Sequence, residues 1–538
     1  MAKKTSVRRP RQQTKGRKNP VATGARARPP VRRAGLTFRD PIHRDITVGP
    51  VQAAIIDTPI FQRLRYIRQT GLLHFVFPGA VHTRFAHSIG TMHLAQRVFR
   101  SLFPGHRHAD TDDRRSALRY VGTVFETAAL LHDVGHCAFS HAIEAVSIEG
   151  KPLLGPIGEL VAAWADPCLT RWWEQKPSAL TIPKRTAHEH IGLLMMTVLL
   201  GGHRYPNIAD IIKHELEVEP GSFADDVRAI VGGELPPSEY FRECASNITG
   251  GPSAGVTVPP ETRAEDLLFV LHSLVSGTLD VDRMDYLLRD SLHTGAPYGI
   301  YDLDVLVNSI AVHASDGDFG PHLDLALWSR AVGALDDMLW SRYQLFSQVL
   351  NHKTNVMLNA LLAAEAIPQA FADVNKTGLG PPRDLDDFVQ FTDDRVMSAI
   401  IRACLGKTSP DRAYARALFS RELPLHLGTL PLSGKNNSRT DKRATDARRA
   451  ALAGDLGVPA AAIREWKARS DLVKGGGLPW VLRKSKIGGE VEMHALGGSG
   501  GYQIIGWTDS KRLPAKVELM HFFVDRGAMK PQGGKPKK

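Results

Sequence analysis

The sequence is poor in cysteine and lacks long hydrophobic runs. Its four cysteines, Cys137, Cys168, Cys244 and Cys404, are scattered and show no CxxC spacing. This scarcity excludes a disulfide framework and a structural zinc knuckle, and it favours reduced thiols. The longest apolar runs, such as residues 194–200, are far shorter than the roughly 20 residues of a membrane span. We therefore expect no membrane partner and a cytoplasmic location.

Signals of three other protein classes are also missing. No apolar segment follows the basic N-terminus, so we expect no secretory signal peptide. Residues 188–190 read HEH, and without the HExxH spacing they do not indicate a zinc protease. The glycines near the C-terminus precede no Gly-Lys-Ser or Gly-Lys-Thr sequence, which indicates turns and not a phosphate-binding loop.

Acidic residues are absent from the first 35 positions. Residues 1–35 hold twelve Lys or Arg and no Asp or Glu, whereas the whole chain carries a net charge of +12. The other residues therefore sum to a net charge of 12 − 12 = 0. The Pro, Gly, Arg and Gln content of this segment cannot build a core, which predicts a disordered basic tail. Two roles remain open for it, a solubilising or processing tail and an arm that binds nucleic acid or polyphosphate.

Helical periodicity dominates the rest of the chain, which predicts a mainly α fold. Apolar residues recur at helical spacing in the segments 87–102, 115–131, 188–200, 264–288 and 330–363. Strand patterns are sparse and occur at 74–77, 323–325, 489–494 and 502–507. The predicted parts are a helical core over 36–431, a basic linker over 432–449, a smaller mixed α/β C-terminal subdomain over 450–526 and a basic tail over 527–538.

The segment 129–144, ALLHDVGHCAFSHAIE, is the most suggestive of chemistry. It places His132, Asp133, His136 and His141 within ten residues of an otherwise apolar stretch. His132 and His136 are four positions apart and share a face if the helix continues. Neutral imidazoles and a carboxylate are ligands that suit a divalent first-row metal.

Further ligands have to come from other segments, because a His-Asp pair cannot close a metal site alone. Upstream, Arg84 and His87 are three positions apart, which puts both on one helical face. Downstream, Asp282, Tyr286 and Asp290 recur at helical spacing and form a polar stripe on an apolar helix. We interpret the three segments together as one divalent metal centre.

The order of these residues, a His, then His-Asp, then Asp, resembles the pattern of the HD superfamily. Residues 40–90, LLHDVGHCAFSH, DVDRMDYLLRD and WSRYQLFSQVLNHK are similar to the deoxynucleotide triphosphohydrolases of that superfamily. This family comprises the bacterial dGTPases and the vertebrate enzymes that couple a sterile-alpha-motif domain to an HD domain. The resemblance is strongest over residues 36–360 and implies an HD-domain helical core.

The resemblance implies a divalent metal cofactor (Mn, Fe, Mg or Zn), a dNTP substrate and a role for each residue of the site. Planar Arg side chains suit phosphate oxygens, and a carboxylate one turn from a histidine suits an acid–base pair. The implied residues are the metal ligands His87, His132, Asp133 and Asp282, the phosphate-binding residues Arg84, Arg283, Tyr286 and Arg342, the sugar-binding residues Gln69 and Asp290, and the catalytic residues His141, Glu144, His136 and His188.

The resemblance also implies the reaction. Water attacks the α-phosphorus, His141 protonates the leaving 5′-oxygen with help from Glu144, and deoxynucleoside and inorganic triphosphate are released. The competing cleavage to monophosphate and pyrophosphate is not excluded by the residues themselves. Depletion of dNTPs in antiphage defence and control of dNTP pools both fit such an activity.

In the vertebrate relatives, nucleotides bind between subunits and drive tetramer formation. The resemblance therefore implies a nucleotide activator and a homo-oligomer, with a tetramer favoured. Leu36, Arg39, Trp328 and Leu350 depart from the family pattern, which leaves the activator and the preferred base open. The matching positions are Asp57, Gln62 and Arg65 in one group and Val76, Phe77, His352 and Lys353 in another.

Three alternatives remain at this point. Asp57 precedes Thr58-Pro59, a plausible helix start, so its carboxylate has helix capping as an alternative role. The whole protein has two alternative functions. One is an HD nucleotidase or phosphodiesterase acting on another nucleotide, and the other is a nucleotide-gated nucleic-acid-binding protein that uses the basic tail.

Overall fold

The computed structural model describes residues 36–104, 111–175, 186–248, 252–253, 256–257, 263–317, 320–372, 374–404, 413–432, 439–471, 480–484, 491–494 and 516–525. The predictions for both basic tails, 1–35 and 527–538, and for a strand at 502–507 fall outside these residues. In the described part of the chain, no helix is both long and apolar enough to cross a bilayer.

The fold is mainly α, as predicted. The helices of eight or more residues are α3 (Arg84–Leu102), α4 (Asp112–Leu131), α6 (Ile157–Trp164), α7 (Pro167–Gln175), α8 (His188–Leu200), α9 (Pro206–Leu216), α10 (Pro220–Gly232), α11 (Glu239–Ile248), α12 (Ala264–Ser276), α13 (Val281–Thr294), α15 (Val332–Gln344), α16 (Lys353–Leu361), α20 (Asp393–Cys404) and α22 (Arg439–Leu456). Shorter α-helices are α1 (Pro50–Ile56), α2 (Pro59–Gln62), α5 (His141–Glu144), α14 (Leu303–Val307), α17 (Ile367–Phe371), α18 (Val374–Thr377), α19 (Leu385–Gln390) and α21 (Ala413–Phe419).

The remaining helical turns are of the 3-10 and π types. The 3-10 turns are η1 (Arg63–Tyr66), η2 (Gly71–Phe75), η4 (Ser329–Ala331) and η7 (Ala460–Ala462). The π turns are η5 (Leu345–Leu350) and η6 (Leu362–Ala366). Both π turns follow α-helices that carry predicted site residues, Arg342 on α15 and Lys353 on α16, and π turns are often found at functional sites.

Strands form small sheets around the helices. A hairpin of β1 (Leu36–Asp40) and β2 (Arg44–Val48) opens the described chain. A four-stranded sheet has the order β12 (Val491–His494), β11 (Trp480–Lys484), β8 (Gly320–Trp328) and β7 (Ile310–Gly317). A three-stranded antiparallel sheet has the order β10 (Ile463–Asp471), β13 (Lys516–Val524) and β9 (Leu425–Pro431). The pairs β3 (Ser147–Ile148) with β4 (Lys151–Pro152) and β5 (Pro252–Ser253) with β6 (Val256–Thr257) are two residues long.

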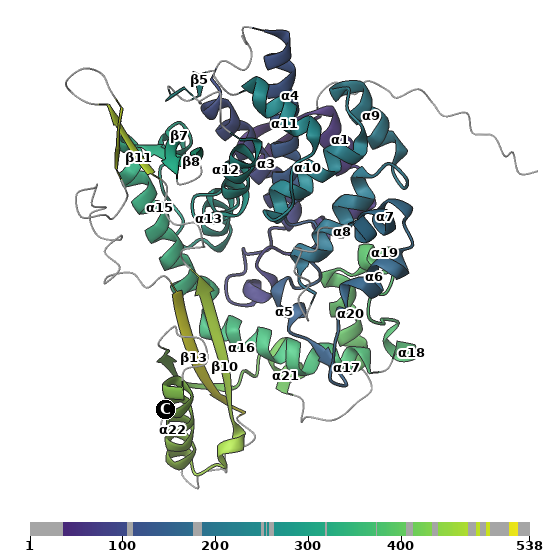
Figure 1. Ribbon diagram of the computed structural model, residues 1–538. Helices are drawn as coiled ribbons and strands as arrows, with labels where there is room; N and C mark the ends of the chain where they lie inside the picture. The colour runs from purple at the N-terminus through teal and green to yellow at the C-terminus, as the bar shows by residue number, and fades with distance from the viewer. Residues whose placement is uncertain are drawn as a thin grey trace, which may run out of the picture. The chain divides into compact units, whose positions relative to one another are not determined.

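One hydrophobic core joins the helices that carry the site. Figure 1 shows these helices, with α3, α4, α10, α12 and α13 in the upper part of the view. Within this core α3 packs on α4 and α13, and α10 packs on α4, α8 and α12. Local sequence fixes where two of these helices begin. Thr111 caps α4 by accepting a hydrogen bond from the Arg114 amide at 3.1 Å, and Asp280 caps α13 by accepting one from the Arg283 amide at 2.8 Å. The Asp280 cap sets the end of α13 that carries Asp282, whereas His132 and Asp133 follow the opposite end of α4 from its cap.

Three predicted elements differ from the structure. The segment 264–288 forms two helices, because Gly277 is extended and Asp280 starts α13. The segment 330–363 is interrupted by η5 and by His352, whose extended backbone starts α16. The strand predicted at 74–77 is wrong: His74 and Phe75 belong to η2, Val76 has a helical backbone, and residues 74–77 are all half-buried, without the alternation of a strand.

Near the C-terminus, several elements cross the boundaries of the predicted parts. Residues 439–449 belong to α22 instead of a linker, because helix-forming Ala, Arg and Lys fill this segment and Leu452 and Ala453 bury one face of the helix. β9 lies within the predicted helical core, yet it pairs with β13. β11 lies in the predicted subdomain, yet it pairs in parallel with β8. The mixed α/β part therefore interleaves with the helical core along the sequence.

Candidate active site

A cavity of about 740 Å³ brings together residues from distant parts of the sequence. It is bounded by α3, the turn after α4, α5, α8, α13, α15 and the π turns, together with one strand of the C-terminal sheet. The predicted site residues that line it are Gln69, Arg84, Asp133, His136, His141, His188, Asp282, Tyr286, Asp290 and Arg342.

The four predicted metal ligands project from three helix ends. His87 lies in the first turn of α3, and Asp282 lies in the first turn of α13. His132 and Asp133 follow directly after α4, which ends at Leu131. The α4 helix therefore does not continue to His136, and the shared helical face expected for His132 and His136 is absent. His132 turns toward His87, with ring centroids 5.2 Å apart.

The donor atoms of these four residues converge. His87 Nε2 lies 3.0 Å from Asp282 Oδ1 and 3.6 Å from Asp133 Oδ2. His132 Nε2 lies 3.4 Å from Asp133 Oδ1 and 3.6 Å from Asp282 Oδ1. Burial alone would raise the pKa of Asp133, but Arg84 and the nearby imidazoles outweigh it and hold that pKa well below its usual range. Two imidazole nitrogens and two carboxylates thus face one small volume.

The hydrogen bonds behind the two imidazoles test whether this set fits a metal ion. His87 Nδ1 contacts Asp285 Oδ2 at 2.7 Å, and His132 Nδ1 contacts the Ala129 carbonyl oxygen at 2.8 Å. Because both partners are acceptors, each Nδ1 carries a proton, so Nε2 is the nitrogen that would offer its lone pair to a metal ion in place of a second proton. Both Nε2 atoms are buried and face the carboxylates of Asp133 and Asp282. The set therefore fits a divalent ion.

Asp285 is a buried residue behind the donor set that the sequence did not single out for a role. Its two carboxylate oxygens contact His87 Nδ1 and His43 Nε2, each at 2.7 Å, and accept from Arg289 Nε and Nη2 at 2.7 and 2.8 Å. Burial would raise the pKa of Asp285, but Arg289 and the two imidazoles keep it well below its usual range. An ionised Asp285 therefore fixes the ring of His87 and its tautomer.

Replacing Asp285 with Asn is expected to lower metal affinity by about 10- to 100-fold, the usual effect of losing such a supporting carboxylate. The amide retains the size of the carboxylate but loses its charge and one acceptor. Metal affinity is measured by titrating the metal-free protein with Mn²⁺ and following binding by calorimetry.

The matched control for this substitution is Asp226→Asn. Asp226 is also buried, and it bonds to the Tyr120 hydroxyl at 2.5 Å and the Ser238 amide at 2.7 Å. Its substitution shows how far metal affinity falls when a buried carboxylate away from the metal donors is lost. Equal metal affinity in Asp285→Asn and the unaltered protein would remove Asp285 from the metal centre.

A second cluster of titratable groups lies beside the metal donors. His136, His141, Glu144 and His188 offer nitrogen and oxygen atoms that all lie within 4.8 Å of one another. Glu144 contacts His188 Nδ1 at 2.7 Å and lies 3.6 Å from His141 Nδ1. Burial would raise the pKa of Glu144, but His141 and His188 outweigh it and lower that pKa. Glu144 is thus an ionised carboxylate between two imidazoles.

The two clusters are connected through His136. Its ring stacks on that of His188 with centroids 3.6 Å apart, and its Nε2 lies 3.3 Å from Asp133 Oδ1. His141 differs from both, because its side chain is 69% exposed and lines the cavity. Of the three imidazoles, His141 is therefore the most accessible to a bound molecule.

The predicted phosphate-binding residues divide into two groups. Arg84, Tyr286 and Arg342 line the cavity, and Arg84 is positioned by Asp133 and by Ser140 Oγ, the latter at 2.9 Å. Burial raises the pKa of Tyr286 to about 12, so its hydroxyl stays protonated and can donate. Arg283 is buried behind this wall and donates to the Thr278 carbonyl oxygen at 2.8 Å. It is not among the residues that line the cavity.

The predicted sugar-binding residues lie at the same cavity. Gln69 Oε1 is buried and makes no hydrogen bond within the described residues. Asp290 Oδ1 contacts His82 Nε2 at 2.7 Å. Leu350, which departs from the family pattern, also lines the cavity, and it presents a hydrocarbon surface there.

None of the seven predicted activator residues lines this cavity. Arg65 lies over the Phe85 ring at 3.5 Å and donates to Gln62 Oε1 at 2.7 Å. Asp57 follows the end of α1, and the N-cap of α2 is Thr58, which accepts from the Phe61 amide at 3.3 Å. The second group meets through Phe77 and His352, whose ring centroids are 6.2 Å apart, with Val76 and Lys353 next to them in sequence.

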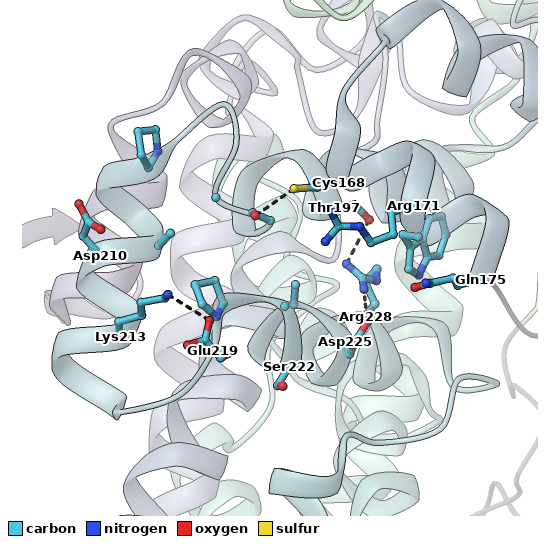
Figure 2. A pocket seen from close by; sticks show the side chains of 18 residues that line it. Cys168, Arg171, Gln175, Thr197, Asp210, Lys213, Glu219, Ser222, Asp225 and Arg228 are labelled. Atoms are coloured by element: carbon cyan, nitrogen blue, oxygen red, sulfur yellow. Dashed lines mark hydrogen bonds and ion pairs between the residues drawn. The ribbon is translucent and has the colours of Figure 1, made fainter.

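Another cavity, of about 650 Å³, lies between α7, α8, α9 and α10 (Figure 2). Arg228 is held there by Thr197 Oγ1 at 3.1 Å and by Asp225, and Lys213 pairs with Glu219 at 3.0 Å. Its charged side chains thus largely pair with one another. No predicted site residue lines it, so the cavity with the metal donors is the candidate active site.

Comparison with known proteins agrees with this geometry. A family model described as "HD domain" matches residues 84–222, which include His87, His132 and Asp133. A protein of Methanocaldococcus jannaschii is 26% identical over 70% of this chain and 60% of its own length. The deoxynucleoside triphosphate triphosphohydrolase SAMHD1 of Gallus gallus is 28% identical over 73% of this chain and 56% of its own length. SAMHD1 of Homo sapiens is 26% identical over 71% of this chain and 53% of its own length.

Solved structures share the fold at lower sequence identity. A phosphohydrolase from Bacteroides thetaiotaomicron superposes with a TM-score of 0.55 at 20% identity, covering 92% of this chain and 100% of that chain. A protein from Aquifex aeolicus superposes with a TM-score of 0.54 at 20% identity, covering 92% of this chain and 97% of that chain. By contrast, this chain spans little more than half the length of the SAMHD1 proteins that it matches.

Proposed function

Because the chain belongs to the HD superfamily of metal-dependent phosphohydrolases, we propose that it hydrolyses dNTPs to deoxynucleoside and inorganic triphosphate. The observation that carries this proposal is the composition of one cavity. There the donors for a divalent ion lie beside Arg84, Arg342 and Tyr286, which suit a chain of phosphates. A substrate with fewer phosphates needs fewer cations.

The side chains around the cavity suggest how such a reaction proceeds. The chemistry that a divalent ion supplies in this donor set is activation of water and withdrawal of charge from a phosphoryl oxygen. Arg84 and Arg342 bind the triphosphate and stabilise negative charge that develops at the α-phosphorus. His141 donates a proton to the leaving 5′-oxygen, and the ionised Glu144 orients the imidazoles. Gln69 and Asp290 hold the sugar 3′-hydroxyl.

Activation by a nucleotide is part of the proposal. The two groups of residues outside the cavity, one around Arg65 and one around Phe77 and His352, support it because each combines an aromatic ring with a cationic or titratable side chain. A nucleotide bound between subunits stabilises the assembled state by linkage. We expect the activator to be a dNTP and the assembly to be a tetramer, serving dNTP depletion or pool control.

Chromatography of the products from each of the four dNTPs, alone and in mixtures, tests the function. With Mn²⁺ present we expect deoxynucleoside and triphosphate as the only products, and a faster rate in mixtures than for the same dNTP alone. Light scattering in the same solutions reports whether mass rises toward a tetramer.

Other outcomes of that experiment identify the alternatives. Monophosphate with pyrophosphate would show cleavage on the other side of the α-phosphorus. Turnover of a monophosphate or a cyclic nucleotide in place of dNTPs would identify a nucleotidase or phosphodiesterase. Nucleic-acid binding without any turnover would indicate the nucleotide-gated binding protein. Equal rates alone and in mixtures at constant mass would contradict the activation.

A further inference from the structure

The cavity is lined by two chemically different sets of residues. One set carries the metal donors, the arginines and the imidazoles described above. The other set comes from residues 346–363 and the C-terminal sheet and is Phe346, Leu350, Asn359, Ala363 and Trp466; the apolar residues Phe139, Ala142 and Ala145 line the cavity beside the imidazoles. Arg342, Phe346 and Leu350 follow one another along α15 and η5, and the Arg342 guanidinium lies over the Phe346 ring at 5.3 Å. The apolar set therefore starts directly beside Arg342, a predicted phosphate-binding residue.

Trp466 is the only member of the apolar set that comes from the C-terminal sheet. On β10 successive side chains alternate between the two faces, so Arg464, Trp466 and Ala468 share one face. Ile463 and Glu465 lie on the opposite face, where Ile463 joins the small core under α22 and Glu465 pairs with Arg449 of that helix at 3.4 Å. The alternation thus fixes Trp466 on the side of β10 away from α22.

Contacts on the same face hold β10 against the helical core. Arg464 forms an ion pair with Glu365 of η6, a turn that also contributes Ala363 to the cavity. Phe523 lies opposite Arg464 on β13 and belongs to the main hydrophobic core. Trp466 itself packs against that core while remaining partly exposed at the cavity. Its indole is therefore held in place before any ligand binds.

Among the described residues, no aromatic ring stacks on the Trp466 indole. A rigid, partly exposed indole at a cavity wall offers a flat surface to a planar ligand. We propose that Trp466 stacks on the base of the substrate nucleotide, so that the C-terminal sheet supplies the base-binding wall of the active site. This inference rests on the proposed function, because it takes the triphosphate to lie at the arginines and the metal donors.

Stacking has a consequence for specificity. Every base presents a flat π-surface, so an indole platform accepts all four bases and discriminates mainly by ring size. Purines cover more of an indole than pyrimidines do. We therefore expect loss of Trp466 to weaken binding of all four dNTPs, and of the purine dNTPs most.

The test compares Trp466→Ala and Trp466→Phe with the unaltered full chain. For each protein, KM and kcat are measured for the four dNTPs with Mn²⁺, and dissociation constants are measured by calorimetry for a dNTP and for inorganic triphosphate. Triphosphate has no base, so its affinity reports the phosphate end of the cavity alone. Trp466→Phe is the matched control, since it keeps an aromatic surface.

The expected result is a rise in KM and in the dNTP dissociation constant of about 5- to 150-fold in Trp466→Ala, as found for loss of one base-stacking side chain. Triphosphate affinity should stay constant, and Trp466→Phe should retain most of the dNTP affinity. Unchanged dNTP affinity in Trp466→Ala would overturn the inference. So would a parallel loss of triphosphate affinity, which indicates a distorted cavity.

The inference and the proposed function fail in different ways. If the unaltered protein hydrolyses no dNTP, the proposed function fails, and the calorimetric comparison still decides whether Trp466 binds a base. If the unaltered protein hydrolyses dNTPs and Trp466→Ala does so with the same KM, the function stands and the stacking role of Trp466 is wrong.

Discussion

Replacing Asp133 with Ala is expected to abolish dNTP turnover and to remove the bound metal ion while the helical fold remains. Asp133 contributes to three interactions at once, because its carboxylate faces His87 and His132 and also pairs with Arg84. Losing a metal ion removes several kcal/mol of charge stabilisation, which corresponds to a rate loss of at least about 10³-fold. Turnover is followed by product chromatography, and metal content by inductively coupled plasma mass spectrometry.

Two further variants separate loss of metal from loss of structure. Asp133→Asn keeps the volume of the side chain, and Asp112→Ala removes an aspartate whose side chain is 90% exposed and pairs only with Arg115 among the described residues. Removing one partner of a buried ion pair costs about 3–5 kcal/mol, so circular dichroism and thermal unfolding accompany each measurement. Full turnover with a full complement of metal in Asp133→Ala would contradict the assignment.

The parts of the site that could be predicted from sequence are those carried by local patterns. The segment 188–200 was expected as a helix, and α8 has these bounds. The donor residues were found because His132, Asp133, His136 and His141 lie within ten residues of one apolar stretch, and because Asp282, Tyr286 and Asp290 recur at helical spacing. Their roles as ligands and as sugar- or phosphate-binding residues stay predictions. What the structure adds is that their side chains meet at one cavity or directly behind it.

The residues that were missed depend on contacts between distant segments. Trp466 reaches the cavity because β10 pairs with β13 and β13 with β9, and no local period encodes which strands pair. Asp285 was visible in the motif DVDRMDYLLRD, but its role follows from facing His87 and His43, which come from other elements. Arg283 is the opposite case. The family resemblance of its motif implies a phosphate contact, whereas the structure buries its side chain behind the cavity wall.

The proposed role of His141 as the acid that protonates the leaving group can be tested more directly than the metal centre, because one substitution should change kcat alone. His141→Ala is expected to lower kcat by about 10²- to 10⁴-fold, the usual range for losing general acid–base catalysis, with metal content and KM unchanged. The physical reason is that the exposed His141 side chain faces the cavity and has Glu144 within 3.6 Å. His214→Ala is the matched control, since that imidazole is 74% exposed and lies outside the cavity.

A substrate whose leaving group needs no proton can show whether His141 is a general acid or a binding residue. The triphosphate ester of 4-nitrophenol releases a stable phenolate, so its hydrolysis should be much less sensitive to His141→Ala than that of a dNTP. Equal losses for both substrates would mean that His141 does not protonate the leaving group. If KM rises while kcat holds, His141 binds substrate, and the acid is His188 or His136. His188 is then the first to test, because its Nδ1 lies 2.7 Å from Glu144, closer than that of His141.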